Sequence, residues 1–307
     1  MSLIEKAAAK LKKNESLVER AAKKLKDVSA TEGDKSVSVN ENSSMTSLET
    51  KRLNEKTKPV ATMARVKLDL KVLQQKNILT SDDVENSMTT EEFRIIKRSL
   101  LLRAFSKGEA AIKNGNIVLV TSTQPDEGKT FCAVSLALSM AQERDLTVLL
   151  VDADVAKPDV LHTLGVKGSK GLIDVIENKD MDLSECLIRT NIPNLTILPA
   201  GKKHKLTTEL LASERMGEII DEIARRYHDR IIIIDAPPVL ASSAASVLAL
   251  HVGQILFVVE AERTREEELN DAFKMIDKCK NINLLLNKAR FAGGKKKFGS
   301  YYGYGYN

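Results

Sequence analysis

The stretch TSTQPDEGKT, residues 121–130, decides the fold of this chain. It stands between a short apolar run, NIVLV at 116–120, and a helix-like segment, FCAVSLALSMA at 131–141. In that context the pattern GxxxxGK[ST] binds phosphate, because backbone NH groups and the helix N-terminus surround the phosphate oxygens. One position departs from the pattern, since Thr123 stands where the first glycine is usual. The stretch therefore predicts a phosphate-binding loop (P-loop), with Lys129 on the β and γ phosphates and the Thr130 hydroxyl on magnesium.

The rest of the sequence alternates between apolar runs and helix-like segments. The runs are NIVLVT (116–121), TVLLVD (147–152), NLTILPA (194–200), RIIIIDAPP (230–238), QILFVVE (254–260) and NINLLLN (281–287). Helical patterns such as FCAVSLALSMAQE and SERMGEIIDEIARRY separate them. Continuous apolar strands between helices indicate a parallel sheet that is covered on both faces. We therefore predict an α/β fold with a doubly wound, mainly parallel sheet.

Carboxylates follow two of these predicted strands. Asp152 and Asp154 stand at and just after the end of TVLLVD, and Asp235 ends RIIIID. The carboxyl ends of parallel strands meet at one edge of the sheet, and a buried carboxylate is costly without a cation. Such residues can also cap the following helix, which is the interpretation adopted for Asp159. For Asp152 and Asp235 the nearby P-loop favours magnesium, which prefers oxygen ligands.

Composition places the chain among globular proteins. It has 307 residues, 43% hydrophobic and 29% charged, with a formal net charge of +5, which is enough to bury a sizeable core. No run of about 18 apolar residues is present, and MSLIEKAAAKLKK lacks the apolar stretch of a signal peptide, so we expect a cytoplasmic protein. Cys132, Cys186 and Cys279 have no CxxC spacing and are predicted to be reduced packing residues.

The first 88 residues divide into two parts. SLIEKAAAKLKK from Ser2 recurs as SLVERAAKKLKD from Ser16, which predicts a basic amphipathic helical segment over 1–27. This segment could dock on a partner, lie on an anionic membrane or remain a solvated helix. Residues 28–88 are predicted to be a polar linker, with a short strand or helix at 66–79. A helix capped at Thr89, with Glu92 three residues on, then begins the domain at 89–290.

Four of the five tyrosines lie within the last seven residues, in FGSYYGYGYN. The stretch 291–307 has no periodicity and is predicted to be a flexible tail. Phosphoryl transfer needs a nucleophilic hydroxyl in line with the γ phosphate, and a phenol on such a tail can enter a neighbour's cleft. The predicted phosphoryl acceptors are therefore Tyr301, Tyr302, Tyr304 and Tyr306.

Together these motifs resemble the bacterial tyrosine kinases, specifically the freestanding cytoplasmic autokinases of exopolysaccharide export (the exosortase-associated subgroup). The resemblance covers about residue 89 to the end. It rests on the P-loop, DADVAKP at 152–158, IIIIDAPP at 231–238, LPAGKKHKLTTELLASERM at 198–216, EEFRIIKRSLL at 91–101 and the tyrosine-rich end. It implies a P-loop NTPase fold of the ParA/MinD-like type with deviant Walker motifs. It also implies an autokinase that uses ATP and Mg²⁺, acts in trans between subunits and regulates exopolysaccharide polymerisation and export.

The resemblance further implies roles for single residues. The expected catalytic residues are Lys129, Asp152 and Asp154, with Asp152 as base or orienter of the attacking hydroxyl. The expected metal site comprises Thr130, Asp154 and Asp235, directly or through water. The expected nucleotide site comprises Thr123, Asp126, Glu127, Gly128, Lys129, Thr130, Phe131 and Asn287. The expected oligomerisation motif, ExxRxxR with lysine in its last place, comprises Glu91, Arg94 and Lys97.

The same resemblance implies partners: further copies of the chain in a ring, a membrane chain-length regulator that activates it at the inner membrane face, and a protein tyrosine phosphatase. Two positions depart from the family pattern. Ala156 stands where arginine is usual, so that a supporting cation is missing or replaced by Lys157, and Ser243 stands where aspartate is frequent. Either departure could lower the rate, and neither removes the metal ligands.

Two other functions compete with this interpretation. A ParA- or MinD-type positioning ATPase shares the fold but carries an additional lysine early in the loop, where this chain has Gln124. An ATP-dependent assembly scaffold would leave the tyrosines incidental. Nucleic-acid binding is not expected, because no recognised reading module accompanies the lysine clusters.

Overall fold

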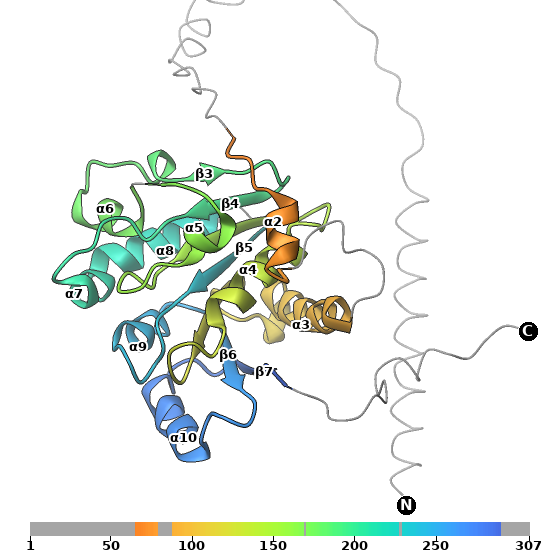
Figure 1. The fold of residues 1–307 in the computed structure, drawn as a ribbon. Coiled ribbons are helices and arrows are strands. Elements are labelled where there is room, and N and C mark those ends of the chain that lie inside the picture. Colours follow the sequence, from red (N-terminus) through yellow and green to blue (C-terminus); the bar gives the residue numbers. More distant parts are fainter. Residues whose placement is uncertain (1–64, 79–87, 169, 227–228, 290–307) are drawn as a thin grey trace, which may run out of the picture. The chain divides into compact units, whose positions relative to one another are not determined.

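A mainly parallel sheet organises the protein (Figure 1). The computed structural model describes residues 65–78, 88–168, 170–226 and 229–289. Within these ranges the sheet has seven strands in the order β3-β4-β2-β5-β1-β6-β7. Their bounds are β1 Ile117–Ser122, β2 Thr147–Asp152, β3 Ile188–Arg189, β4 Leu195–Leu198, β5 Arg230–Asp235, β6 Gln254–Glu260 and β7 Ile282–Asn287. Every pairing is parallel except that of β3 with β4.

Successive side chains of the central strands enter two separate hydrophobic cores. Ile117 and Leu119 of β1 belong to one core, while Val118 and Val120 belong to the other. All four side chains are fully buried. This explains the continuous apolar runs, because a strand that is covered on both faces has no polar face. The prediction of a doubly wound α/β fold is confirmed.

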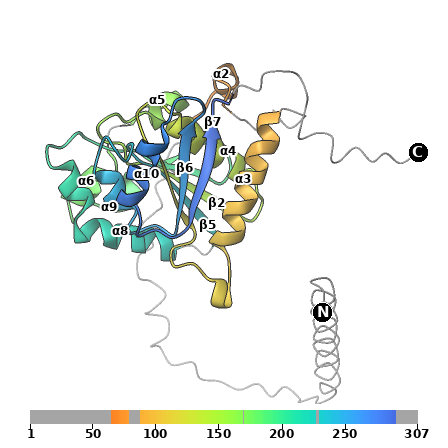
Figure 2. The same ribbon diagram turned by 90° about the horizontal axis from the view of Figure 1, so that it is seen from below.

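The helices form two layers on the two faces of the sheet (Figure 2). One core is covered by α2 Leu70–Gln75, α3 Met88–Ala104, α4 Lys129–Met140 and α5 Val160–Leu164. The other is covered by α6 Leu172–Glu177, α7 Thr207–Leu211, α8 Glu214–Arg226, α9 Ala244–Leu248 and α10 Glu266–Met275. Helix α4 is buried along nearly its whole length, because it contacts β1, β2 and β5 of the sheet as well as α3 and α5.

The structure differs from the sequence prediction in two details. Strand β3 has two residues, too few for an apolar pattern to show. Helix α3 already includes Met88, so Thr89 lies in its first turn rather than at its N-cap, and the predicted cap is wrong. The expected short element at 66–79 corresponds to α2, preceded by a single parallel bridge from Val66 to Thr190.

Several predictions fall outside the described residues: the repeat at 1–27, most of the linker, and the tail at 291–307 with its tyrosines. Cys132, Cys186 and Cys279 are buried free thiols, which confirms their predicted packing role. None of the helices in the described part of the chain is long and apolar enough to cross a membrane.

Candidate functional site

The P-loop joins β1 to α4 in a conformation that requires glycine. Gly128 has φ 96° and is the N-cap of α4. A Cβ at Gly128 would lie 2.1 Å from Asn287 Nδ2, a distance at which two atoms overlap. The same Asn287 amide donates a hydrogen bond of 2.9 Å to the Glu127 carbonyl. Asn287 therefore contacts the P-loop at Glu127 and Gly128 and supports its backbone. This is its position relative to the predicted nucleotide site.

Side chains from distant parts of the sequence hold the loop in place. Glu127 is 1% exposed and accepts hydrogen bonds from the Gln124 backbone NH, at 2.8 Å, and from the Thr264 hydroxyl. Lys288 Nζ donates to the Asp126 carbonyl at 2.7 Å. Because these groups fix the loop backbone, its NH groups are positioned before any anion arrives, which lowers the entropic cost of binding.

Lys129 and Thr130, the first residues of α4, contact the predicted carboxylates. Lys129 Nζ lies 2.8 Å from Asp154 Oδ2, and both side chains are nearly buried. The Thr130 hydroxyl donates to Asp235 Oδ2 at 2.7 Å. Asp152 lies opposite Asp235 in the register of β2 and β5, so that neighbouring strands end in neighbouring carboxyl groups. The structure thus brings together the residues predicted as catalytic and metal-binding.

Burial controls the protonation of this cluster. Desolvation, followed by the charge of Asp235, raises the pKa of Asp152 to about 7. Desolvation also raises the pKa of Asp235 to about 6, although Lys129 and the Thr130 hydrogen bond oppose the shift. For Lys129, burial pulls the pKa down, but Asp235 and Asp154 outweigh it and the pKa is raised. The lysine is therefore a cation at neutral pH, and a further positive charge in the site would favour the ionised forms of Asp152 and Asp235.

The cluster fits a magnesium ion that is shared with a nucleotide. Asp235 Oδ1 is buried and has no hydrogen-bond partner in the part of the chain that the structure describes, whereas Oδ2 accepts a hydrogen bond from the Thr130 hydroxyl. A carboxylate oxygen without a partner and an adjacent hydroxyl are ligands that Mg²⁺ prefers. Among the described residues, no group of three or more His, Cys, Asp or Glu side chains is placed to hold a metal alone. Such an ion would therefore complete its shell with phosphate oxygens and water, as is usual for Mg²⁺.

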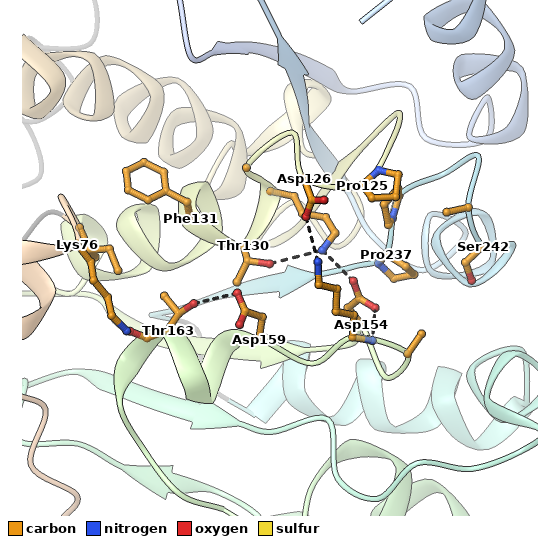
Figure 3. Close-up of a pocket in the computed structure, with 17 residues that line it drawn as sticks. Lys76, Pro125, Asp126, Thr130, Phe131, Asp154, Asp159, Thr163, Pro237 and Ser242 are labelled. Atoms are coloured by element: carbon orange, nitrogen blue, oxygen red, sulfur yellow. Dashed lines mark hydrogen bonds and ion pairs between the residues drawn. The ribbon is translucent and has the colours of Figure 1, made fainter. Parts of the chain in front are cut away.

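A pocket of about 480 Å³ lies beside the loop (Figure 3). Five of the residues predicted for the nucleotide site line it, namely Asp126, Gly128, Lys129, Thr130 and Phe131. The other three, Thr123, Glu127 and Asn287, are not among its lining residues. The lining residues that the sequence analysis did not assign to the nucleotide site include Lys76, Ile78, Lys157, Thr163, Pro237 and Ser242.

Two of these additional lining residues carried a sequence signal. Pro237 belongs to the IIIIDAPP motif, and Lys157 belongs to DADVAKP. Lys157 Nζ lies 3.0 Å from Asp126 Oδ1, so a cation does reach the loop from the position next to Ala156. Lys76 and Ile78 lie in a segment whose composition gave no sign of a binding site.

Asp159 occupies the N-cap position of α5, as predicted, but its side chain makes no hydrogen bond to the helix backbone. It accepts instead from the Thr163 hydroxyl at 3.1 Å. The Val160 backbone NH donates to Asp152 Oδ2 at 3.2 Å. The start of α5 is thus tied to Asp152 in the site.

The three residues of the expected oligomerisation motif do not share one environment. Glu91 and Arg94 form an ion pair on the exposed side of α3. Lys97 is 9% exposed, and its Nζ donates to the Ser139 carbonyl at 3.3 Å and lies 2.6 Å from Glu143 Oε1. Lys97 therefore holds α3 against the C-terminal end of α4, whereas Glu91 and Arg94 face outward.

A P-loop at the edge of a parallel sheet, with lysine, threonine and two strand-end aspartates, defines a P-loop nucleotide-binding protein. A family model described as "AAA domain" matches residues 115–288, more than half of the chain. The putative tyrosine-protein kinase CapB of Staphylococcus aureus is 30% identical over 225 residues, which cover 73% of this chain and 93% of CapB.

Two further comparisons agree. The tyrosine-protein kinase Wzc of Salmonella typhimurium is 32% identical over 194 residues, which cover 62% of this chain and 26% of Wzc. This chain thus matches about a quarter of the length of Wzc. The solved kinase domain of VpsO has 29% identity and a TM-score of 0.54, over 66% of this chain and 100% of that domain. The chain therefore belongs to the bacterial tyrosine-protein kinases, a family of enzymes with a P-loop NTPase fold, and the resemblance to this family is confirmed.

Proposed function

We propose that this chain is an ATP- and Mg²⁺-dependent autokinase whose subunits phosphorylate one another on the tyrosine cluster at 301–306. The observation that carries the proposal is the buried cluster at the start of α4. There Lys129 pairs with Asp154 at 2.8 Å, and the Thr130 hydroxyl bonds to Asp235 at 2.7 Å. A cation and two oxygen groups beside the P-loop would suit the γ phosphate of a bound nucleotide and its Mg²⁺, which supports the proposal.

Each residue of the cluster has a different proposed role in binding the nucleotide and Mg²⁺. Lys129 would leave Asp154 for phosphate oxygens and stabilise their negative charge. Thr130 and Asp235 would hold Mg²⁺, which when bound neutralises charge on the β and γ phosphoryl oxygens. Lys157, on the exposed rim beside Asp126, supplies a second cation near the loop.

Asp152 is suited to accept or orient the proton of an incoming phenol. Burial raises its pKa to about 7 in the absence of a cation, so the carboxylate is a better proton acceptor than an ordinary aspartate. Backbone NH groups of Asp154 and Val160 each donate to its carboxylate at 3.2 Å, which fixes the orientation of the group. Asp152 is therefore the proposed catalytic carboxylate, and Asp154 the partner that holds Lys129 before nucleotide binds.

The test is mass spectrometry of the purified protein after incubation with ATP and Mg²⁺. We expect phosphate on Tyr301, Tyr302, Tyr304 and Tyr306, and none in Lys129→Met, whose change removes the phosphate-binding cation. Lys71→Met, on the exposed α2 surface, is the matched control and should behave like the parent. Asp152→Asn should also lose phosphotyrosine but retain more nucleotide binding than Lys129→Met. Hydrolysis of ATP without phosphotyrosine would instead favour a ParA/MinD-like assembly or positioning ATPase.

The family resemblance extends the proposal to regulation. We infer a homo-oligomeric ring that acts in the cytoplasm at the inner membrane face through a membrane chain-length regulator and controls exopolysaccharide polymerisation and export. A protein tyrosine phosphatase would reverse the modification. Mixing a Lys129→Met subunit with a subunit in which all four tyrosines are phenylalanine tests transfer in trans. Phosphate should appear on the Lys129→Met subunit only when the two are combined.

A further inference from the structure

Residues 65–78 precede the region that the family model matches, yet they are built into the domain. The Val66 NH donates to the Arg189 carbonyl at 2.8 Å, and the Asn191 NH donates to the Val66 carbonyl at 3.0 Å. Asn191 also accepts from the Leu68 NH through its Oδ1, at 2.7 Å. The N-terminal half of the segment is therefore fastened to the edge of the sheet beyond β3.

Three apolar side chains of the segment and Lys76 fasten it to the rest of the domain. Leu68, Leu73 and Ile78 are at most 2% exposed and belong to the hydrophobic core on the α3 and α4 face. Lys76 Nζ donates to two backbone carbonyls at the end of α5, those of His162 at 3.3 Å and Thr163 at 3.2 Å. The segment thus crosses from the sheet edge to the mouth of the P-loop pocket.

At that mouth the segment becomes part of the pocket itself. Lys76 and Ile78 line the same cavity as Lys129, Thr130 and Phe131. In Figure 3, Lys76 lies beside Thr163 on the same side of the pocket as Phe131. The P-loop accounts for the phosphates, and of its residues only Pro125 adds an apolar side chain to the pocket. Ile78 and Phe131 are the large apolar side chains that line this pocket.

We propose that the end of this segment, Lys76 and Ile78, forms a wall of the nucleotide site. Ile78 and Phe131 contact the nucleoside half of the ligand, and Lys76 holds the wall closed through its two bonds to α5. The inference rests on the proposed function only in requiring that a nucleotide occupies the P-loop. It adds specificity-determining residues from a part of the chain that carries no nucleotide motif.

The test separates nucleoside binding from phosphate binding. Isothermal titration of the full chain with ADP and with pyrophosphate, both with Mg²⁺, measures the two affinities. For Ile78→Ala we expect the ADP affinity to fall about three- to tenfold, because apolar contact is lost, while pyrophosphate affinity is unchanged. Val72→Ala is the matched control, because Val72 lies in the same segment, on α2, and is 39% exposed. Unchanged ADP affinity, or equal losses for ADP and pyrophosphate, would overturn the proposal.

A second pair of variants tests the wall without changing the buried Ile78. Lys76→Met and Lys71→Met each remove one exposed lysine of the same segment, and only the first breaks the bonds to α5. We expect weaker ADP binding in Lys76→Met alone.

Hydrogen exchange should also slow at the amides of Leu73–Ile78 when ADP is added to the parent, and no change there would contradict the wall. Lys129→Met should lose both ligands, and a parent chain that binds neither would count against the proposed kinase instead.

Discussion

Asp152 is 1% exposed, and its carboxylate oxygens accept two backbone hydrogen bonds, each 3.2 Å long. Its pKa is about 7 in the folded protein, raised first by desolvation and then by Asp235. In an unfolded chain the pKa of aspartate is about 3.9. Between these two values the folded protein binds more protons than the unfolded one, so its stability falls as the pH rises. In the absence of a cation, the ionised group therefore costs stability above pH 7.

This cost predicts a stabilising effect of a substitution at the proposed catalytic residue. Without nucleotide and with a chelator present, Asp152→Asn should raise the free energy of unfolding at pH 8 by about 1–2 kcal/mol. The full effect of the pKa shift is larger, but asparagine keeps only one of the two acceptor oxygens. At pH 5, where the parent carboxyl is protonated when folded, the gain should shrink. Thermal unfolding at both pH values is the measurement, and an equal change at both would refute this account.

At the scale of elements, the sequence predicted those features of the fold that depend on a local pattern of apolar residues. The six parallel strands were recognisable because each is a largely continuous apolar run, although β7 at the edge of the sheet exposes Leu284 and Leu286. Asp152 and Asp235 could be grouped because both end such strands. Their adjacency follows from the pairing of β2 with β5. Strand β3 was missed because two residues are too few to show a period. Lys76 was missed for another reason, since its contacts with α5 join residues 86 and 87 positions apart.

The role of Lys97 also depends on contacts that no local pattern shows. The ExxRxxR spacing places Glu91, Arg94 and Lys97 near one side of a helix, but small differences in angle decide which of them meets α4. Lys97 reaches Ser139 and Glu143, whereas the side chain of Arg94 is 43% exposed and pairs with Glu91. The motif therefore combines an intramolecular anchor with an outward-facing pair.

Because Lys97 packs against α4 and Arg94 is exposed, substituting Lys97 should affect stability, whereas substituting Glu91 and Arg94 should affect assembly. Lys97→Met should lower the free energy of unfolding by about 1–2 kcal/mol, because the Ser139 carbonyl and Glu143 lose a nearly buried partner. Arg94→Ala should change it by less than about 0.5 kcal/mol, as is usual for exposed ion pairs. The mass measured by light scattering should change in the other variant: the Glu91→Ala, Arg94→Ala double variant should lose assembly, and Lys97→Met should not. Denaturant unfolding checks the first claim, and an unchanged mass of the double variant would remove these residues from the interface.

At the scale of the whole molecule, charge links the site to the tyrosine cluster. Three lysines and three aspartates line the pocket, so their charges balance: Lys76, Lys129, Lys157, Asp126, Asp154 and Asp159. A bound nucleoside triphosphate would make the pocket negative. The stretch 291–307 contains Lys295, Lys296 and Lys297 and no acidic side chain, so its side chains carry +3. Unmodified, this stretch and an occupied site have opposite signs and attract each other.

Phosphorylation should reverse that attraction. Each phosphotyrosine adds about −1.5 to −2 charges, so four would add about −6 to −8 and turn the stretch strongly negative. The modified chain should then be repelled from a neighbour's occupied site, and the oligomer should dissociate. The measurement is sedimentation velocity of the fully phosphorylated protein against a variant with Tyr301, Tyr302, Tyr304 and Tyr306 all changed to Phe. The difference should be largest at low salt and shrink at physiological ionic strength, where the screening length is about 8 Å. If both proteins show the same distribution of oligomers at low salt, the charge of the tyrosine cluster does not control assembly.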